Sequence, residues 1–152
     1  NFWGQVHINL EFEGLIPTAP GEAQFSQFRK NLMTFVAICK VNGIQPVLMT
    51  QFNRITVKEM NNNPVFDYFK RKLATGGLTV EQYCGWYERM NQITRDVAEE
   101  DGAILVDLDK AIPKTKENIY DLVHLTNQGS RLAAQVILEK LYPAVSQMAA
   151  HQ

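Results

Sequence analysis

Two short apolar runs constrain the fold more than any other feature of the sequence. "IQPVLMTQF" (44–52) and "AILVDL" (103–108) are each bounded by glycine or polar residues. Continuous apolar runs of this length are typical of strands covered on both faces, as in parallel sheets. A long helical pattern separates the two runs, and the order strand, helix, strand favours parallel pairing with a right-handed crossover. The sequence therefore predicts an α/β fold.

Three amphipathic helices are predicted around these strands. Apolar residues recur at three- and four-residue steps from Phe25 to Cys39, as on the buried face of a helix. The capping box Thr79-Val80-Glu81-Gln82 opens a second helical stripe that continues to about Glu100. Thr126 is expected to cap a last helix, which Tyr142-Pro143 is expected to stop.

The first residues predict one further strand, "GQVHINLEF" (4–12). Three parallel strands make a thin sheet, and three helices are few to cover the apolar runs at 44–52 and 103–108. The chain also begins without Met and almost inside a predicted strand. We therefore expect a single domain, 1–152, that lacks its first strands.

Composition limits the partners and the class of protein. With 152 residues, 45% of them hydrophobic, the chain can bury one core. Fifteen basic and sixteen acidic residues give a net charge of −1, which is not the basic surface of a nucleic-acid-binding protein. No apolar run approaches the roughly 20 residues of a membrane span. The polar segment 53–79 is a long insert, expected as a loop with a short helix around 65–73, and such connections are usually functional or mobile.

The stretch "YDLVHLTNQG" (120–129) carries the strongest chemical signal. It follows a predicted strand and places Asp121 three residues before His124. A carboxylate beside a histidine fixes the imidazole tautomer and stabilises the imidazolium, as in the orienting and base half of a nucleophilic triad. In the alternative, Asp121 satisfies loop amides and His124 packs over the helix start.

The sequence around this pair resembles the terminal motif block of the SGNH (GDSL-type) hydrolases. "YDLVHLTNQGSRLAAQVILEKL" has Asp-x-x-His, then Leu-Thr and a Gly three residues on. "GIQPVLMTQFNR" and "YERMNQITRDVAEEDGAILVDL" are similar to the preceding strands and helix of that family, so the resemblance covers about residues 25 to 142. It implies a flavodoxin-like three-layer α/β/α fold with a parallel sheet, and the insert 53–79 on the active-site side.

The resemblance also implies an esterase mechanism without a metal or other cofactor. His124 would be the general base and Asp121 would hold it, while Asn9 would supply an oxyanion donor, although "HINL" has His7 and Leu10 where the family has Gly and Asp. The substrate would be an acyl or acetyl ester, with acylated carbohydrate as one candidate. Arg54, at the carboxyl end of the predicted strand 44–52, could hold an anionic or carbohydrate substrate. The alternatives are a turn-forming Asn9 and a solvent-exposed loop Arg54.

The nucleophile of the family, the serine of a Gly-Asp-Ser block, has no counterpart in this sequence. Ser26, Ser130 and Ser146 are not placed like a nucleophile. We therefore expect the serine to come from an N-terminal segment outside these 152 residues. Two other functions stay open: a non-catalytic α/β binding module that has lost the serine, and a metal-dependent hydrolase using His7 and His124.

Overall fold

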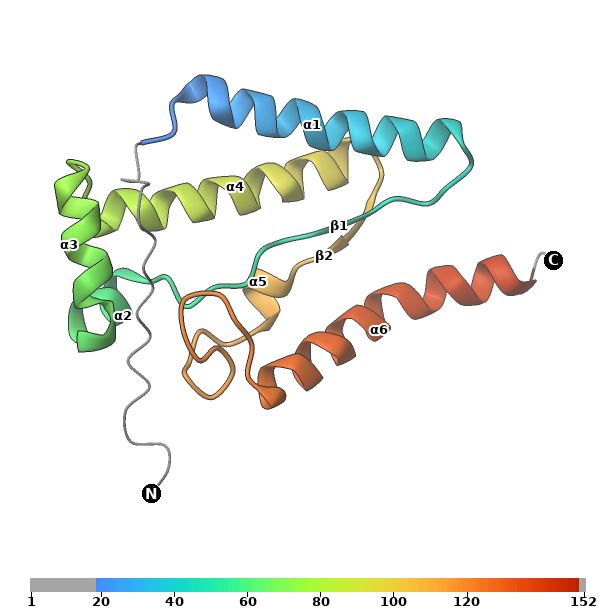
Figure 1. Ribbon diagram of the computed structural model, residues 1–152. Helices are drawn as coiled ribbons and strands as arrows, with labels where there is room; N and C mark the ends of the chain where they lie inside the picture. The colour runs from blue at the N-terminus through green and yellow to red at the C-terminus, as the bar shows by residue number, and fades with distance from the viewer. Residues whose placement is uncertain (1–18, 151–152) are drawn as a thin grey trace.

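The computed structural model describes residues 19–150, and the predicted strand 4–12 and Asn9 lie outside them. The chain alternates helices with two short strands (Figure 1). In order, the elements are α1 (Glu22–Val41), β1 (Val47–Met49), α2 (Val57–Asn62), the 3-10 helix η1 (Pro64–Phe66), α3 (Asp67–Thr75), α4 (Val80–Glu100), β2 (Ile104–Val106), α5 (Leu108–Ala111) and α6 (Asn127–Ala150).

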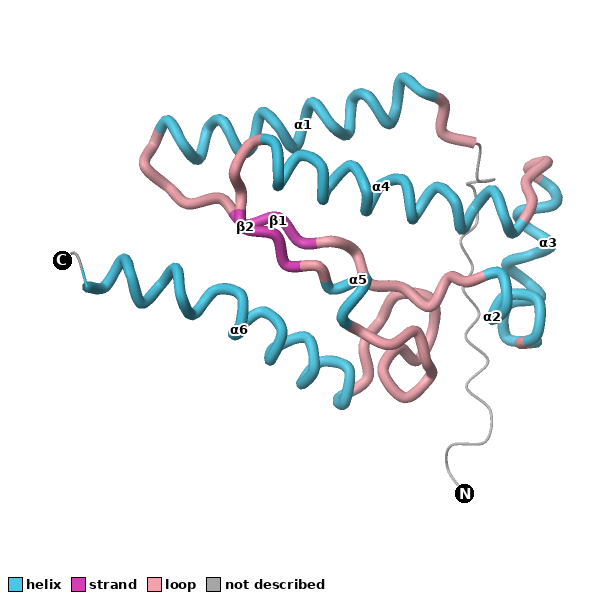
Figure 2. Tube along the Cα trace, turned by 180° about the vertical axis from the view of Figure 1, so that it is seen from behind, coloured by secondary structure: helices cyan, strands magenta, loops and turns pink. Residues whose placement is uncertain are grey.

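The two strands lie within the two apolar runs and pair in parallel, with Leu48 opposite Leu105. α4 is the crossover that connects them, since it starts after β1 and ends just before β2. α1 lies beside α4 on one side of the strands, and α6 runs on the other side (Figures 1 and 2). The described chain is therefore loosely α/β: mostly helical, with a two-stranded parallel sheet.

Side-chain alternation along the strands explains why helices cover both faces of the sheet. Leu48 of β1 packs in one buried cluster with Val36 of α1 and Val97 of α4. Val106 of β2 belongs to a second cluster, which includes Ala133 of α6. Successive residues of a strand point to opposite faces, so each short apolar run can contribute to clusters on both faces.

The insert, residues 53–79, differs from its prediction, because it is largely helical instead of a loop with one short helix. Thr56 caps α2 by accepting a hydrogen bond from the amide of Glu59, and Asn63 caps η1 in the same way through Val65. Its apolar side chains then form a core of their own, which packs on aromatic residues of α4 and on Leu122 and Val123: Ile55, Met60, Phe66, Leu73 and Leu78.

The last helix also differs from its prediction. α6 passes through Pro143 and ends at Ala150, eight residues beyond the expected stop at Tyr142. Proline removes one amide donor from a helix, so the carbonyl four residues earlier, on Glu139, loses its partner. Both residues are exposed, and water can satisfy that carbonyl.

Among residues 19–150, no helix has the length and apolarity needed to cross a membrane.

Candidate functional site

The residues 118–126 form a closed loop, here called the Asp–His loop, between α5 and α6. The amide of Tyr120 donates to the carbonyl of His124 at 3.0 Å, and the amide of Thr126 donates to that of Asn118 at 2.9 Å. These two hydrogen bonds join the two sides of the loop as in a hairpin. The residues between Tyr120 and His124 therefore form a tip with a defined backbone.

Asp121 and His124 are paired at this tip. Oδ2 of Asp121 lies 2.7 Å from Nδ1 of His124. The other oxygen, Oδ1, accepts hydrogen bonds from the amides of Val123 (2.9 Å) and His124 (2.8 Å). Burial raises the pKa of Asp121, but the hydrogen bonds from these amides and from the imidazole outweigh it and hold that pKa below its ordinary value. The carboxylate is thus fixed by contacts to both of its oxygens.

The imidazole of His124 remains accessible although it is paired. Its side chain is 65% exposed, whereas that of Asp121 is 25% exposed. The ring of Tyr120 stacks on it, with centroids 5.7 Å apart and planes 19° apart. An ionised carboxylate only accepts hydrogen bonds, so the contact assigns the proton of neutral His124 to Nδ1. Nε2 is then the ring nitrogen that can accept a proton from another group.

Close packing between the loop and α6 explains the Leu-Thr-x-x-Gly spacing. Thr126 caps α6 as predicted, because its Oγ1 accepts a hydrogen bond from the amide of Gly129 at 3.1 Å. A Cβ added at Gly129 would lie 2.1 Å from the carbonyl oxygen of Asn118. Only glycine therefore lets the first turn of the helix approach the loop this closely.

Arg54 is buried, so the interpretation of an exposed loop arginine is wrong. Its side chain is 2% exposed, and Nη1 donates to the carbonyl of Ile119 at 2.8 Å. Its Nε lies 3.4 Å from a carboxylate oxygen of Glu59. A substrate-binding role of Arg54 stays a prediction; the contacts described for its side chain join it to the Asp–His loop and to the insert.

A buried charge network at the carboxyl ends of both strands was not predicted. Arg95 of α4 donates to Asp107 (Nε, 2.8 Å) and to Asp109 (Nη2, 2.7 Å), and Lys114 donates to Asp109 at 2.7 Å. Thr50, directly after β1, donates to Asp107 at 2.9 Å. Asp107 also caps α5 by accepting a hydrogen bond from the amide of Lys110 at 3.4 Å. The sequence feature that could have indicated this network is Arg95, an arginine on the buried, strand-facing side of the amphipathic helix α4.

These acids do not form a metal site. Within residues 19–150, no group of His, Cys, Asp and Glu side chains has an arrangement that could hold a metal ion. Asp107 and Asp109 are neutralised by Arg95 and Lys114. His7, which the metal-dependent alternative requires, lies outside the described residues, as does Asn9.

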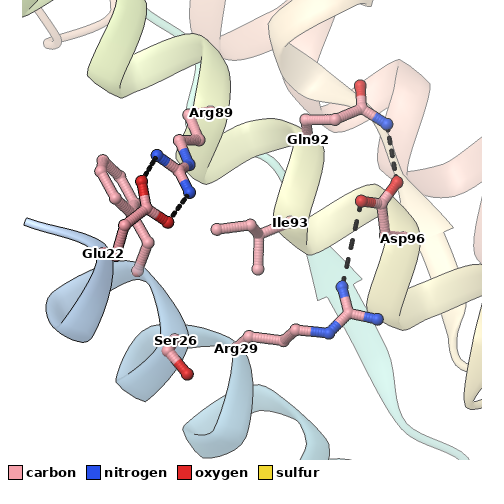
Figure 3. A pocket seen from close by; sticks show the side chains of 8 residues that line it. Glu22, Ser26, Arg29, Arg89, Gln92, Ile93 and Asp96 are labelled. Atoms are coloured by element: carbon pink, nitrogen blue, oxygen red, sulfur yellow. Dashed lines mark hydrogen bonds and ion pairs between the residues drawn. The ribbon is translucent and has the colours of Figure 1, made fainter.

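A groove of about 400 Å³ between α1 and α4 is lined by Ser26 but by no histidine (Figure 3). Its charged groups pair with each other: Arg89 binds Glu22 through two hydrogen bonds of 2.7 and 2.5 Å, and Arg29 lies 3.9 Å from Asp96. No residue of the Asp–His loop lines it. The groove and the Asp121–His124 pair are therefore separate features.

Comparison with family models, with curated proteins and with solved structures found no match for this chain. The Asp–His loop provides a fixed carboxylate and an accessible imidazole. In the part of the chain that the structure describes, no serine makes a hydrogen bond with that imidazole.

Proposed function

We propose that this chain is part of a serine ester hydrolase of the SGNH type, in which His124 is the general base and Asp121 orients it. One observation supports this above all: the 2.7 Å contact between Oδ2 of Asp121 and Nδ1 of an imidazole whose side chain is 65% exposed. A base of this kind needs a fixed tautomer and an accessible second nitrogen.

The energetics of the pair favour a functional role over a structural one. Oδ1 of Asp121 alone satisfies the two loop amides, so the backbone of the tip does not require the contact with His124. Ion pairs with this much exposure contribute only about 0–1 kcal/mol to stability. The pair therefore adds little to the fold, whereas it gives the imidazole the orientation that proton transfer requires.

The proposed reaction has two acyl-transfer steps. Nε2 of His124 takes the proton of a serine hydroxyl as its oxygen attacks the ester carbonyl, and the imidazolium then returns the proton to the leaving alkoxide. In the second step, His124 deprotonates a water molecule that attacks the acyl-enzyme, which releases the carboxylic acid and returns the proton to the serine. The serine is proposed to come from an N-terminal segment outside these 152 residues, within a three-layer α/β/α domain. Asn9 is the proposed oxyanion donor, and the substrate is an acyl or acetyl ester, with acylated carbohydrate as a candidate.

The test uses the complete gene product that contains these residues. A fluorophosphonate probe should label a serine, and hydrolysis of p-nitrophenyl acetate should be measurable. His124→Ala should abolish labelling, and Asp121→Asn should reduce kcat by about 10³–10⁴-fold, because the wrong tautomer then faces the hydroxyl. Gln128→Ala, an exposed change in the first turn of α6, is the matched control and should leave both readouts unchanged.

Two results would overturn the proposal. Undiminished turnover in His124→Ala would remove the role of the imidazole. A complete protein that neither hydrolyses the ester nor reacts with the probe would instead support the non-catalytic binding module.

A further inference from the structure

We infer that Arg54 is a positioning residue that couples the insert to the tip of the Asp–His loop. Arg54 follows β1 near the start of the insert, and at 2% exposure it is enclosed between the helices of the insert and the Asp–His loop. Its importance for catalysis rests on the proposed function. The effect of Arg54 on the geometry of Asp121 does not rest on that function, and it can be measured without following substrate turnover.

Arg54 holds the Asp–His loop through two carbonyl groups. Its Nη1 donates to the carbonyl of Ile119 at 2.8 Å, and its backbone amide donates to that of Leu122, also at 2.8 Å. Asp121 lies between these two acceptors in the sequence. One residue therefore fixes the loop on both sides of the carboxylate that orients His124.

The same side chain is held by the insert. Its Nε lies 3.4 Å from Oε2 of Glu59 in α2, and its Cζ lies 5.3 Å from the ring centroid of Phe66 in η1. Leu122 and Val123, at the tip of the loop, also pack against the core of the insert. Arg54 thus connects the insert with the loop through polar contacts, beside an apolar contact between the same two parts.

The chemistry of arginine explains why this position requires it. A buried guanidinium is costly unless acceptors and an opposite charge compensate it, and here those are the Ile119 carbonyl and Glu59. Nε of Arg54 has no hydrogen bond of good geometry. Loss of either the Ile119 carbonyl or Glu59 would therefore leave the buried charge of the guanidinium poorly compensated. The planar fork reaches acceptors in two directions, which a lysine ammonium on one flexible stem does not reproduce.

The direct test measures the tip in the full chain by NMR. In Arg54→Met, the amides of Val123 and His124, which donate to Asp121, should exchange with solvent about 5–100-fold faster. The pKa of the Asp121 carboxyl, followed by its ¹³C shift, should rise toward its ordinary value as those hydrogen bonds loosen. Glu59→Gln, a change at a partly exposed side chain, should shift both readouts in the same direction by less, and it keeps the inference testable if Arg54→Met does not fold.

Val36→Ala is the matched control for general destabilisation. Val36 is buried in α1 and belongs to a different cluster, so this variant should unfold more easily without changing the Asp121 titration. The inference is overturned if the Asp121 titration is unchanged in Arg54→Met, or in Glu59→Gln when only that variant folds. It is equally overturned if Val36→Ala shifts that titration as much. An active His124→Ala enzyme would instead remove only the proposed function.

Discussion

Gly129→Ala should destabilise the protein at the junction between the Asp–His loop and α6. The added Cβ would lie 2.1 Å from the carbonyl oxygen of Asn118 and 3.0 Å from Cδ2 of Leu125. Ordinary van der Waals contacts of a Cβ begin at 3.4 Å, so the distance of 2.1 Å is 1.3 Å too short. The obstacle is backbone, and that carbonyl already accepts the amide of Thr126, so the helix or the loop must move.

The expected cost follows from three contributions. Overpacking costs about 1–3 kcal/mol, and loss of the hydrogen bond between Thr126 and Asn118 adds about 1 kcal/mol. Alanine recovers about 0.5–1 kcal/mol, because it is the better helix former. We therefore expect Gly129→Ala to lower the free energy of unfolding by about 1–3.5 kcal/mol.

Urea denaturation followed by circular dichroism measures this loss, and a second glycine provides the control. Gly85 lies inside α4, and an added Cβ there meets nothing within 4 Å. Gly85→Ala should therefore raise the free energy of unfolding by about 0.5–1 kcal/mol. The reasoning would be refuted if Gly129→Ala were as stable as the wild type, or if the two variants shifted in the same direction.

Two further predictions concern the buried charge network. Arg95→Met should lower the free energy of unfolding by about 3–5 kcal/mol, because Asp107 and Asp109 lose a buried partner; a loss under about 1 kcal/mol in urea denaturation would contradict this. Burial raises the pKa of Asp107, but hydrogen bonds from Arg95 and Thr50 hold it below its ordinary value. Its stabilising contribution is therefore present above that ordinary value and is lost as the pH falls through the folded value. Stability should decrease less steeply with acid below about pH 4 in Asp107→Asn than in the wild type, and equal slopes would exclude this role.

Local signals in the sequence predicted the parts of the structure that depend on neighbouring residues. Both strands lie inside the predicted apolar runs, and Thr79 and Thr126 cap the helices that follow them. Caps and helical periodicity involve residues within a few positions of each other, so they can be read from the chain directly. The same holds for the Asp121–His124 contact, which spans three residues.

The side-chain contacts that sequence analysis missed, at Arg54 and in the charge network, depend on residues far apart in the chain. Sequence analysis left Arg54 as a substrate-holding residue or an exposed loop arginine, but the carbonyl that binds it lies 65 residues away, on Ile119. The contact between Thr50 and Asp107 spans 57 residues. An arginine after a strand has the same local pattern whether it faces water or a loop that returns later. Only the three-dimensional arrangement distinguishes the two.

The charges of Arg95, Asp107 and Asp109 restrict how this sequence can evolve. Replacing one of these residues leaves the others as uncompensated charges in the protein interior, which is strongly destabilising. Replacing the whole set by apolar side chains of similar volume often leaves stability unchanged or raises it. Stepwise substitution must therefore pass through intermediates that fold poorly. We expect these positions to be retained together, while the exposed residues of α1 and α6 drift freely.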